Sequence, residues 1–391
     1  MIHTVELNQQ LTHEEYIELL NEQKELGHIQ IRPDKRNADQ HHTELKVLSD
    51  NGIIFEFKHI CKRNYTGYYI YLRLNSSKLL EDNRLAIFTP ERYPEIEERF
   101  KTLIESFFGS RWMRFSDINS WRVRRIDYCV QFKVHDAQTY IKLFQRGDKP
   151  ARGEYCIPNY HYKDTHISPT DELRKSHKGG SVYFRGGHFT RDSRFVDGSM
   201  NINFYDKHSE MSAPHNDGRY TADELEAAKN IIRIEIQCLR RKIDALSDRD
   251  AKRLSDFLDI ETGRKILLSK YDEVCGKGDY YKLQAARNAV TGNSLIGRTK
   301  TRELCKRVLE LCSGQSTVWK KRMKIADVEL TEEEFDKALK KLNDNGINPT
   351  TLPASYELDE IPSLHDRIEQ YFNSLERTIV NDMDAPELDD E

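Results

Sequence analysis

The stretch MNINFYDKHSE, residues 200–210, puts a tyrosine and a lysine on one face of a predicted strand. Side chains alternate across a β-strand, so Asn203, Tyr205 and Lys207 share one face and the apolar residues between them share the other. A phenol ionises at about pH 10 in water, and a metal ion or a nearby cation favours its phenolate. Tyr205 is therefore a candidate nucleophile with Lys207 as its electrostatic neighbour. The alternative is a tyrosine that only packs, on a solvated face.

Two further predicted strands, at 121–132 and 230–239, alternate between an apolar face and a face with charged residues near its centre. On the first of these strands, Val123 is expected on the charged face. Neighbouring strands lie about 5 Å apart, and same-face residues along one strand lie about 7 Å apart. If the three strands belong to one sheet, their charged side chains gather near Tyr205. These side chains are Arg125, Asp127, Arg233 and Glu235.

A tyrosine among acids and cations is suited to attack on a phosphodiester. Two carboxylates suit a hard cation such as Mg²⁺ or Mn²⁺, which binds one or two carboxylates together with waters and phosphate. Arginines bind phosphate through two parallel hydrogen bonds. The alternative is a ladder of cross-strand Arg–Glu pairs, which is common on the wet face of a sheet.

The elements that must position these residues are interleaved strands and helices in the first part of the chain. Thr12 and Glu15 form a capping box for a helix at 13–26, which Gly27 closes. Capping boxes at 221–224 and 331–334 predict two more helices. The other predicted elements are strands at 53–60, 68–74, 181–185 (ended by Gly186 and Gly187) and 200–207, and helices at 94–108 and 137–146.

This pattern predicts an α+β fold with three parts. Residues 1–245 form the catalytic domain, an antiparallel-rich sheet with helices on one face. Residues 246–355 form an all-α domain of helix-turn-helix or winged-helix type. Residues 356–391 form an acidic, partly disordered tail with one helix at 363–378.

The charge of the chain is segregated between a basic body and an acidic tail. The net charge is −4, but the last 36 residues contain 12 acids and two arginines, so the preceding 355 residues carry +6. A basic body favours a polyanionic partner. The chain lacks a run of 18 apolar residues, a basic-then-apolar leader and a CxxC pair among its seven cysteines, which predicts a cytoplasmic protein without a membrane span.

The segment 300–327 is the most basic part of the predicted helical domain, with eight Lys/Arg against three acids. Basic short helices joined by turns suit a DNA-binding module, and their cations would contact backbone phosphates. A solvated helical bundle is the alternative. The candidate DNA-binding residues are Lys300, Arg302, Lys306, Arg307, Lys320, Lys321, Arg322 and Lys324.

Four segments between Val123 and Cys238 together resemble a known family. VRRIDYCVQF, SVYFRGG, INFYDKHSE and IIRIEIQC, in that order, are similar to the core of rolling-circle replication initiators of the Rep_trans type. The resemblance extends to nicking relaxases of integrative conjugative elements and to gene II/X-type phage replication proteins. Each segment is short and degenerate, so their order and spacing carry the likeness.

The resemblance implies a metal-dependent DNA-nicking and -joining enzyme that starts rolling-circle replication or transfer. The strand tyrosine, here Tyr205, would attack the DNA backbone, become linked to a 5′-phosphate and leave a free 3′-hydroxyl. Asp127 and Glu235 match the acids that hold Mg²⁺ or Mn²⁺. Lys207 and Glu210 match the rest of a Y-x-K-x-x-E pattern, with Glu210 a third metal ligand. Arg125 and Arg233 would complete the catalytic set.

The sequence departs from the better-known relaxases in one motif. It lacks the His-hydrophobic-His metal motif, because His161 and His166 are spaced differently and His41 and His42 are adjacent. This favours the acidic metal site, with the histidine-rich loop 155–190 open as a further ligand source. The resemblance also implies origin duplex DNA, the nicked single strand, a host helicase and a second copy of the chain as partners. The alternative function is a DNA-binding regulator or replication accessory protein without nicking activity.

Overall fold

The computed structural model of the chain has an α+β fold, and its residues form two compact units. Unit 1 comprises Met1–Val130, Ile236–Gly263 and Leu375–Glu391. Unit 2 comprises Gln131–Glu235 and Arg264–Ser374. The residues that the structure describes are 1–33, 41–45, 51–62, 65–80, 85–148, 156–159, 181–189, 195–213, 218–313, 318 and 330–383.

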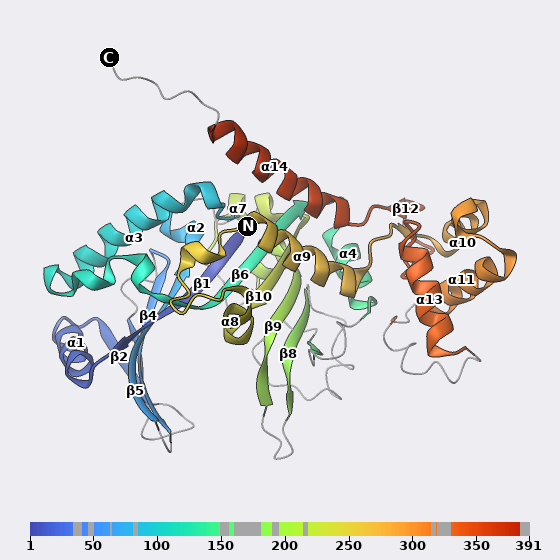
Figure 1. Cartoon of the computed structure of the whole chain (residues 1–391). Coiled ribbons are helices and arrows are strands. Elements are labelled where there is room, and N and C mark those ends of the chain that lie inside the picture. Colours follow the sequence, from blue (N-terminus) through green and yellow to red (C-terminus); the bar gives the residue numbers. More distant parts are fainter. Residues whose placement is uncertain are drawn as a thin grey trace. The chain divides into compact units, whose positions relative to one another are not determined.

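The strands of unit 1 form an antiparallel sheet in the order β2-β3-β4-β5-β1-β6. Ile53, Phe55 and Phe57 of β4 are fully buried and alternate with less buried residues, which is the period of a strand with one covered face. Figure 1 shows β1, β2, β4 and β5 of this sheet in blue and β6 in teal green. The strands are β1 (Ile2–Leu11), β2 (Ile29–Pro33), β3 (His41–Leu45), β4 (Ile53–Lys62), β5 (Tyr65–Asn75) and β6 (Arg122–Lys133), whose last three residues belong to unit 2.

Helices cover the apolar face of the unit 1 sheet. In α1 (His13–Glu25), Tyr16 packs edge-on against Phe57, with 6.1 Å between the ring centroids. In α3 (Tyr93–Phe108), Phe108 packs edge-on against Phe55 at 5.3 Å. Both helices were predicted, and the capping box of Thr12 and Glu15 is present. The other helices here are α2 (Ser76–Leu79), α8 (Arg240–Leu246) and short 3₁₀ turns at Pro90–Arg92, Ser110–Phe115, Ile118–Ser120 and Leu254–Phe257.

Strand β6 contains a register shift that the period-two pattern did not predict. Glu6 of β1 pairs with Arg125, but the next residue, Leu7, pairs with Val123, so Arg124 is an extra residue. Val123 therefore lies on the covered face and is 1% exposed, whereas the alternation had placed it with Arg125. A bulge of this kind changes which face the following side chains reach.

The strands of unit 2 follow the order β10-β9-β8-β7, with antiparallel pairing of β7 with β8 and of β8 with β9. Val182, Phe184, Ile202 and Phe204 are at most 2% exposed and form one apolar face. Phe204 contacts Phe144 of α4 (Ala137–Gln145) and Tyr271 of α9 (Ile260–Cys275). The strands are β7 (Cys156–Asn159), β8 (Ser181–Phe189), β9 (Phe195–Asp206) and β10 (Ile231–Cys238), and helix α7 (Ala222–Ala228) precedes β10.

Two predicted strand ends in unit 2 were wrong. Strand β9 stops at Asp206, because the Asp206 side chain accepts hydrogen bonds from the backbone of His208 and Ser209 and so caps α6 (Lys207–Met211). Lys207 therefore begins a helix and is not a strand residue. The Gly186–Gly187 pair does not end β8, which continues to Phe189 after a register shift between Arg185 and Gly187.

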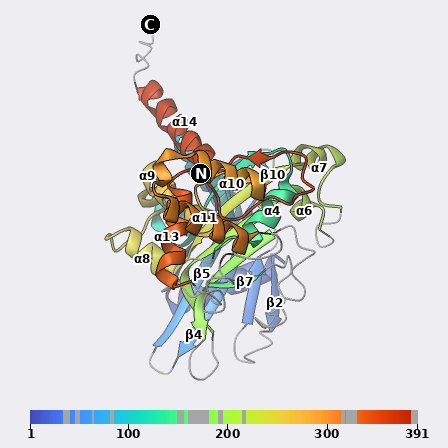
Figure 2. The ribbon, with the colours of Figure 1, turned by 90° about the vertical axis from the view of Figure 1, so that its right-hand side faces the viewer.

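Helices dominate the described residues after β10, as predicted. Helices α10 (Leu283–Gly292), α11 (Thr299–Cys312) and α13 (Glu332–Asn343) bury a common apolar core that includes Val290, Val308 and Phe335. Figure 2 shows these three helices together. A two-stranded sheet of β11 (Tyr280–Tyr281) and β12 (Glu360–Ile361) adjoins them in sequence, and a 3₁₀ turn spans Ser294–Ile296. Assignment of 246–355 to DNA binding stays a prediction.

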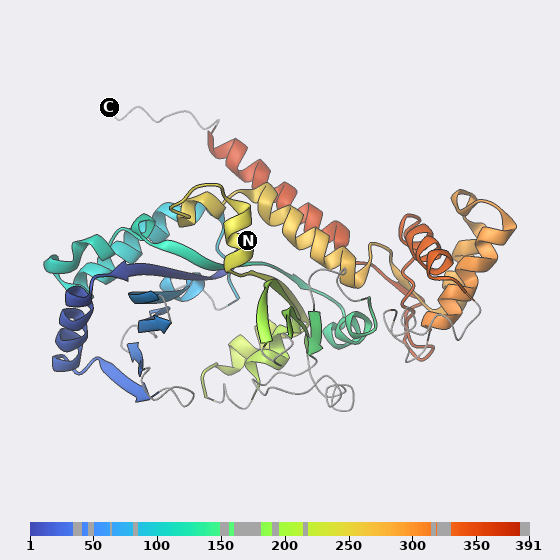
Figure 3. The same cartoon turned by 60° about the horizontal axis from the view of Figure 1, so that its bottom comes forward.

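Helix α14 (His365–Met383) confirms a helix in the acidic tail and runs beyond the predicted end at 378. It packs beside α9, as Figure 3 shows for the gold and red helices. Ile368 and Phe372 are fully buried, and the backbone of Leu364 donates to the Tyr271 hydroxyl at 2.9 Å. The tail beyond 383 lies outside the described residues. Among the described helices, none is long and apolar enough to cross a membrane.

The pH dependence of unfolding should report the ion pair between His365 and Asp272. Their side chains lie 2.7 Å apart, and this hydrogen bond raises the pKa of His365 above its usual 6.5. A histidine with a raised folded pKa contributes stability that is complete below about pH 6.5 and is lost as pH rises through the folded value. We expect Tm, measured by circular dichroism, to fall across this window.

The fall in Tm should be smaller in His365→Gln. The matched control is His135→Gln, because His135 is 65% exposed and faces Glu357 at 3.3 Å. A pH dependence that is unchanged in His365→Gln would contradict the assignment.

Candidate active site

Tyr205 lies next to the end of β9, on the face opposite the apolar contacts of Phe204. Its cross-strand partner is Ser181 of β8, and both residues are about 5% exposed or less. The Tyr205 hydroxyl approaches Glu235 Oε2 of β10 at 3.5 Å, which is a long hydrogen bond. The predicted proximity of Tyr205 and Glu235 is thus present in unit 2, in a buried environment and not on an open face.

Lys207 lies beside this tyrosine at the first position of α6. Its Nζ binds Glu210 Oε2 at 2.6 Å, one helical turn further on, and is 5.9 Å from the centroid of the Tyr205 ring. Lys207 is only 5% exposed. The Y-x-K-x-x-E spacing therefore brings the three side chains together through a strand end and a helix start, and not through one strand face.

Arg233 precedes Glu235 by two residues on β10 and is fully buried. It donates two hydrogen bonds to Gln131 Oε1, from Nε at 3.1 Å and from Nη2 at 2.6 Å. Gln131 of β6 is a functional neighbour that the sequence analysis did not single out. In the structure, Gln131 holds the buried guanidinium of Arg233 in place. The alternation of polar residues along β6 was only a weak signal of this role.

The electrostatics of Lys207 reflect burial and its charged neighbours. Burial lowers the pKa of Lys207, and the positive charge of Arg233 lowers it further, whereas Glu210 and Glu235 act in the opposite direction. In their usual ionised states these four side chains carry two positive and two negative charges. The tyrosine hydroxyl therefore lies among paired charges in a region of low exposure, where electrostatic interactions are stronger than in water.

Asp127 belongs to unit 1, where Arg125 holds its carboxylate. Arg125 Nε donates to Oδ1 and Nη2 donates to Oδ2, both at 2.7 Å, and Asp127 is 1% exposed. Arg125 also contacts Glu6 of β1 at 3.1 Å. This bidentate geometry is the strong form of an Arg–carboxylate pair. Both carboxylate oxygens of Asp127 already accept a hydrogen bond, so a cation there would compete with the guanidinium of Arg125 for them.

Glu210 and Glu235, which both lie near Lys207, are carboxylates of the kind that a hard cation binds. Mg²⁺ and Mn²⁺ take one or two carboxylates and complete their shell with waters and phosphate. Because Lys207 and Arg233 already balance these two acids, an added dication would leave a positive excess that a phosphodiester could neutralise.

A compact group of metal-type ligands among the described residues lies elsewhere, at His365, Asp366 and Glu369. The last two are exposed, and His365 is already hydrogen-bonded to Asp272. Exposed acids in the first turns of a helix stabilise the helix without any metal, because they lie near the positive end of its dipole.

The predicted DNA-binding residues divide between α11 and the undescribed part of the chain. Lys300 and Arg307 are exposed. Lys306 pairs with Glu303 at 2.9 Å, and Arg302 Nη2 donates to the Asn293 carbonyl at 3.3 Å. Lys320, Lys321, Arg322 and Lys324 lie outside the described residues, as do His161 and His166.

Comparison with known proteins gives no family for this chain. No family model matches it, and no curated protein matches it. Among solved structures, the di-domain ARO/CYC BexL from the BE-7585A biosynthetic pathway is similar at 6% identity with a TM-score of 0.19. That match covers 70% of this chain and 96% of that chain. A likeness of this size supports no inference about fold or function.

The role of Asp127 can be tested by unfolding in EDTA. Asp127→Asn removes the negative charge from both of its hydrogen bonds with Arg125 and leaves Glu6 as the acid that pairs with Arg125, so we expect the free energy of unfolding to fall by about 2 kcal/mol without any metal. The control is Asp244→Asn, since the exposed Asp244–Arg122 pair at 3.1 Å should change stability by at most about 0.5 kcal/mol. Equal or greater stability of Asp127→Asn in EDTA would instead indicate a carboxylate kept for metal binding.

Proposed function

We propose that this chain is a sequence-specific, metal-dependent DNA-nicking and -joining enzyme, with Tyr205 as nucleophile, that initiates rolling-circle replication or transfer. The observation that carries the proposal is the contact of the Tyr205 hydroxyl with Glu235 at 3.5 Å, beside Lys207. The order of the four sequence segments that resemble replication initiators supports the same reading.

In the proposed reaction the Tyr205 oxygen attacks a backbone phosphorus. The phenol proton passes to the Glu235 carboxylate, the bond from oxygen to phosphorus forms, and the bond from phosphorus to the 3′-oxygen breaks. The 3′-oxygen leaves and takes up a proton, and the 5′-phosphate stays on the tyrosine. Attack by a 3′-hydroxyl on this phosphotyrosine reverses the step and joins the strand.

Each neighbouring side chain has a role that follows from its chemistry. Glu235 orients the phenol and accepts its proton. Lys207 and Arg233 place positive charge where the phenolate and the phosphate oxygens develop negative charge. A divalent cation held by Glu210 and Glu235 would supply further stabilisation of that charge. Glu210 also fixes the Lys207 ammonium at 2.6 Å.

One observation favours a second candidate function, a DNA-binding regulator or accessory protein that does not nick. Tyr205 is only 5% exposed, so a DNA backbone reaches its hydroxyl only if the neighbouring side chains move. Such a protein would keep the charged interior for stability alone and would form no covalent adduct.

Substitution of the nucleophile separates the two functions. Purified full-length protein is incubated with a supercoiled plasmid that carries its gene and flanking DNA, with Mn²⁺ or with EDTA, and the products are run on a denaturing gel. We expect a nick and a protein–DNA adduct that need Mn²⁺, and a loss of roughly 10³-fold or more in Tyr205→Phe, because no other group replaces the phenol oxygen.

The matched control is Tyr183→Phe, which makes the same change on the neighbouring strand β8, opposite Asn203. It should nick like the wild type. Nicking by Tyr205→Phe at the wild-type rate would contradict the assignment of the nucleophile. Salt-sensitive duplex binding by a wild-type protein that leaves the plasmid supercoiled would favour the regulator.

A further inference from the structure

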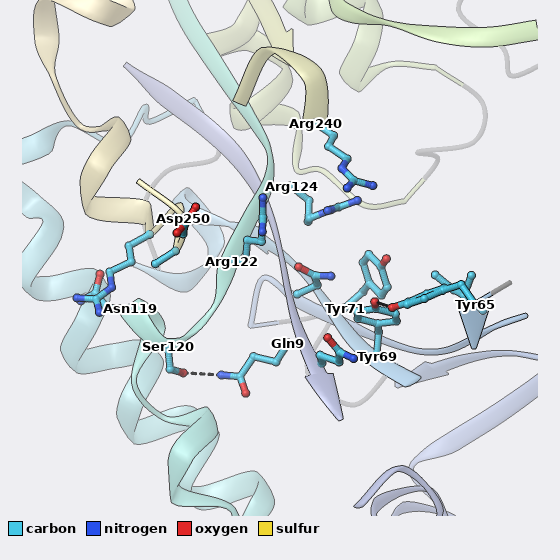
Figure 4. A pocket seen from close by; sticks show the side chains of 15 residues that line it. Gln9, Tyr65, Tyr69, Tyr71, Asn119, Ser120, Arg122, Arg124, Arg240 and Asp250 are labelled. Atoms are coloured by element: carbon cyan, nitrogen blue, oxygen red, sulfur yellow. Dashed lines mark hydrogen bonds between the residues drawn. The ribbon is translucent and has the colours of Figure 1, made fainter. Parts of the chain in front are cut away.

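A pocket of about 890 Å³ in unit 1 gathers tyrosines and arginines and plays no part in the proposed reaction. All its lining residues belong to unit 1, whereas Tyr205 belongs to unit 2. Figure 4 shows Arg122, Arg124 and Arg240 above Tyr65, Tyr69 and Tyr71. The residues that carry charge or a ring are Tyr65, Tyr69, Tyr71, Arg122, Arg124, Arg240, Arg253 and Asp250.

The pairing register of β5, β1 and β6 places residues of the pocket next to one another. Asn8 of β1 pairs with Tyr71 of β5 on one side and with Arg122 of β6 on the other, so an aromatic ring, an amide and a guanidinium form one row across three strands. Neighbouring strands are about 5 Å apart, which sets the spacing of that row. Arg124 follows Arg122 by two residues on β6 and lines the same pocket.

The arginine wall, made of Arg122, Arg124, Arg240 and Arg253, carries four positive charges against two nearby acids, Asp250 in the lining and Asp244 beside it. Asp244 contacts Arg122 at 3.1 Å and Arg240 at 3.7 Å. Within the described residues Arg124 forms no ion pair, and burial together with repulsion from Arg240 lowers its pKa. Guanidinium groups that lie close together repel each other. An anion such as phosphate, bound between them, offsets this repulsion.

The tyrosine wall consists of the exposed ring of Tyr65 and the half-buried rings of Tyr69 and Tyr71. Tyr65 is 44% exposed, and its hydroxyl contacts that of Tyr69. The ring centroids of Tyr69 and Tyr71 are 6.0 Å apart, and Lys58 Nζ lies 4.4 Å from the centroid of the Tyr71 ring. Exposed rings beside a cationic surface are the combination with which proteins bind single strands, since bases stack on the rings and phosphates contact the cations.

We infer that this pocket binds single-stranded nucleic acid, with bases stacked on Tyr65 and Tyr69 and backbone phosphates on Arg122, Arg124 and Arg240. A duplex fits less well, because its bases are stacked on one another and present only their edges. A free nucleotide would use one ring and leave the second ring and part of the arginine wall without a ligand.

The test measures fluorescence anisotropy of a labelled oligo(dT) of roughly 12 nucleotides with the full-length protein in EDTA. Since nicking needs the metal in the proposed function, EDTA makes this result independent of whether Tyr205 is a nucleophile. We expect tighter binding of the single strand than of a duplex of equal length, and only weak competition by dTMP.

Two variants separate the phosphate contacts from the stacking contacts. Arg124→Ala should weaken binding and reduce the slope of log affinity against log salt concentration by about 0.7, the value for one phosphate contact on a single strand. Tyr65→Leu should weaken binding roughly 5- to 100-fold with an unchanged slope, whereas Tyr65→Phe keeps the ring and should bind like the wild type.

The control for charge is Arg249→Ala, because Arg249 lies in unit 1, pairs with Asp256 at 2.6 Å and does not line the pocket. It should leave affinity within about twofold of the wild type. The inference is overturned if oligo(dT) does not bind, if the duplex binds more tightly, if dTMP competes as well as the oligonucleotide, or if Arg124→Ala and Arg249→Ala have the same effect. Circular dichroism spectra confirm that each variant is folded.

Discussion

The cost of burying charge is the constraint on which the polar interior of this chain depends. Arg233, Glu235 and Lys207 are at most 5% exposed, and an unpaired ion in such a position would cost several kcal/mol. Each therefore has a defined partner: Gln131 for Arg233, Glu210 for Lys207, and the Tyr205 hydroxyl for Glu235. Asp127 obeys the same rule in unit 1 through its two bonds to Arg125.

The apolar faces of the strands make this arrangement rigid. Phe204 is held between Phe144 and Tyr271, so the next residue, Tyr205, must project to the opposite side. The Asp206 cap then turns the chain into a helix at the position that brings Lys207 back toward the tyrosine ring. Packing on one face thus fixes the position of Tyr205 on the other face, and the proposed attack on DNA would need such a fixed position.

Much of the fold could be predicted from periodicity and caps, because these signals are local. The helix after Thr12 and the strand at Ile231–Cys238 are examples. Strand β1 was not predicted, since its buried positions do not alternate strictly and tertiary pairing with β5 and β6 defines it. The pocket of Tyr65, Tyr71 and Arg122 was also missed, because it depends on the register of three strands, which leaves no local pattern in the sequence. The expected open face around Tyr205 is buried, because exposure is set by neighbouring strands and helices.

The proposal that Tyr205 attacks DNA is tested most directly by locating the protein–DNA bond. A nicking reaction is quenched, nuclease and trypsin reduce the adduct to a short nucleotide on a peptide, and mass spectrometry finds the modified residue. The expected peptide is 195–207, FVDGSMNINFYDK, which contains a single tyrosine. A nucleotide on Tyr205 is the predicted result. A nucleotide on any other residue, including Tyr65 or Tyr69 of the unit 1 pocket, would contradict it.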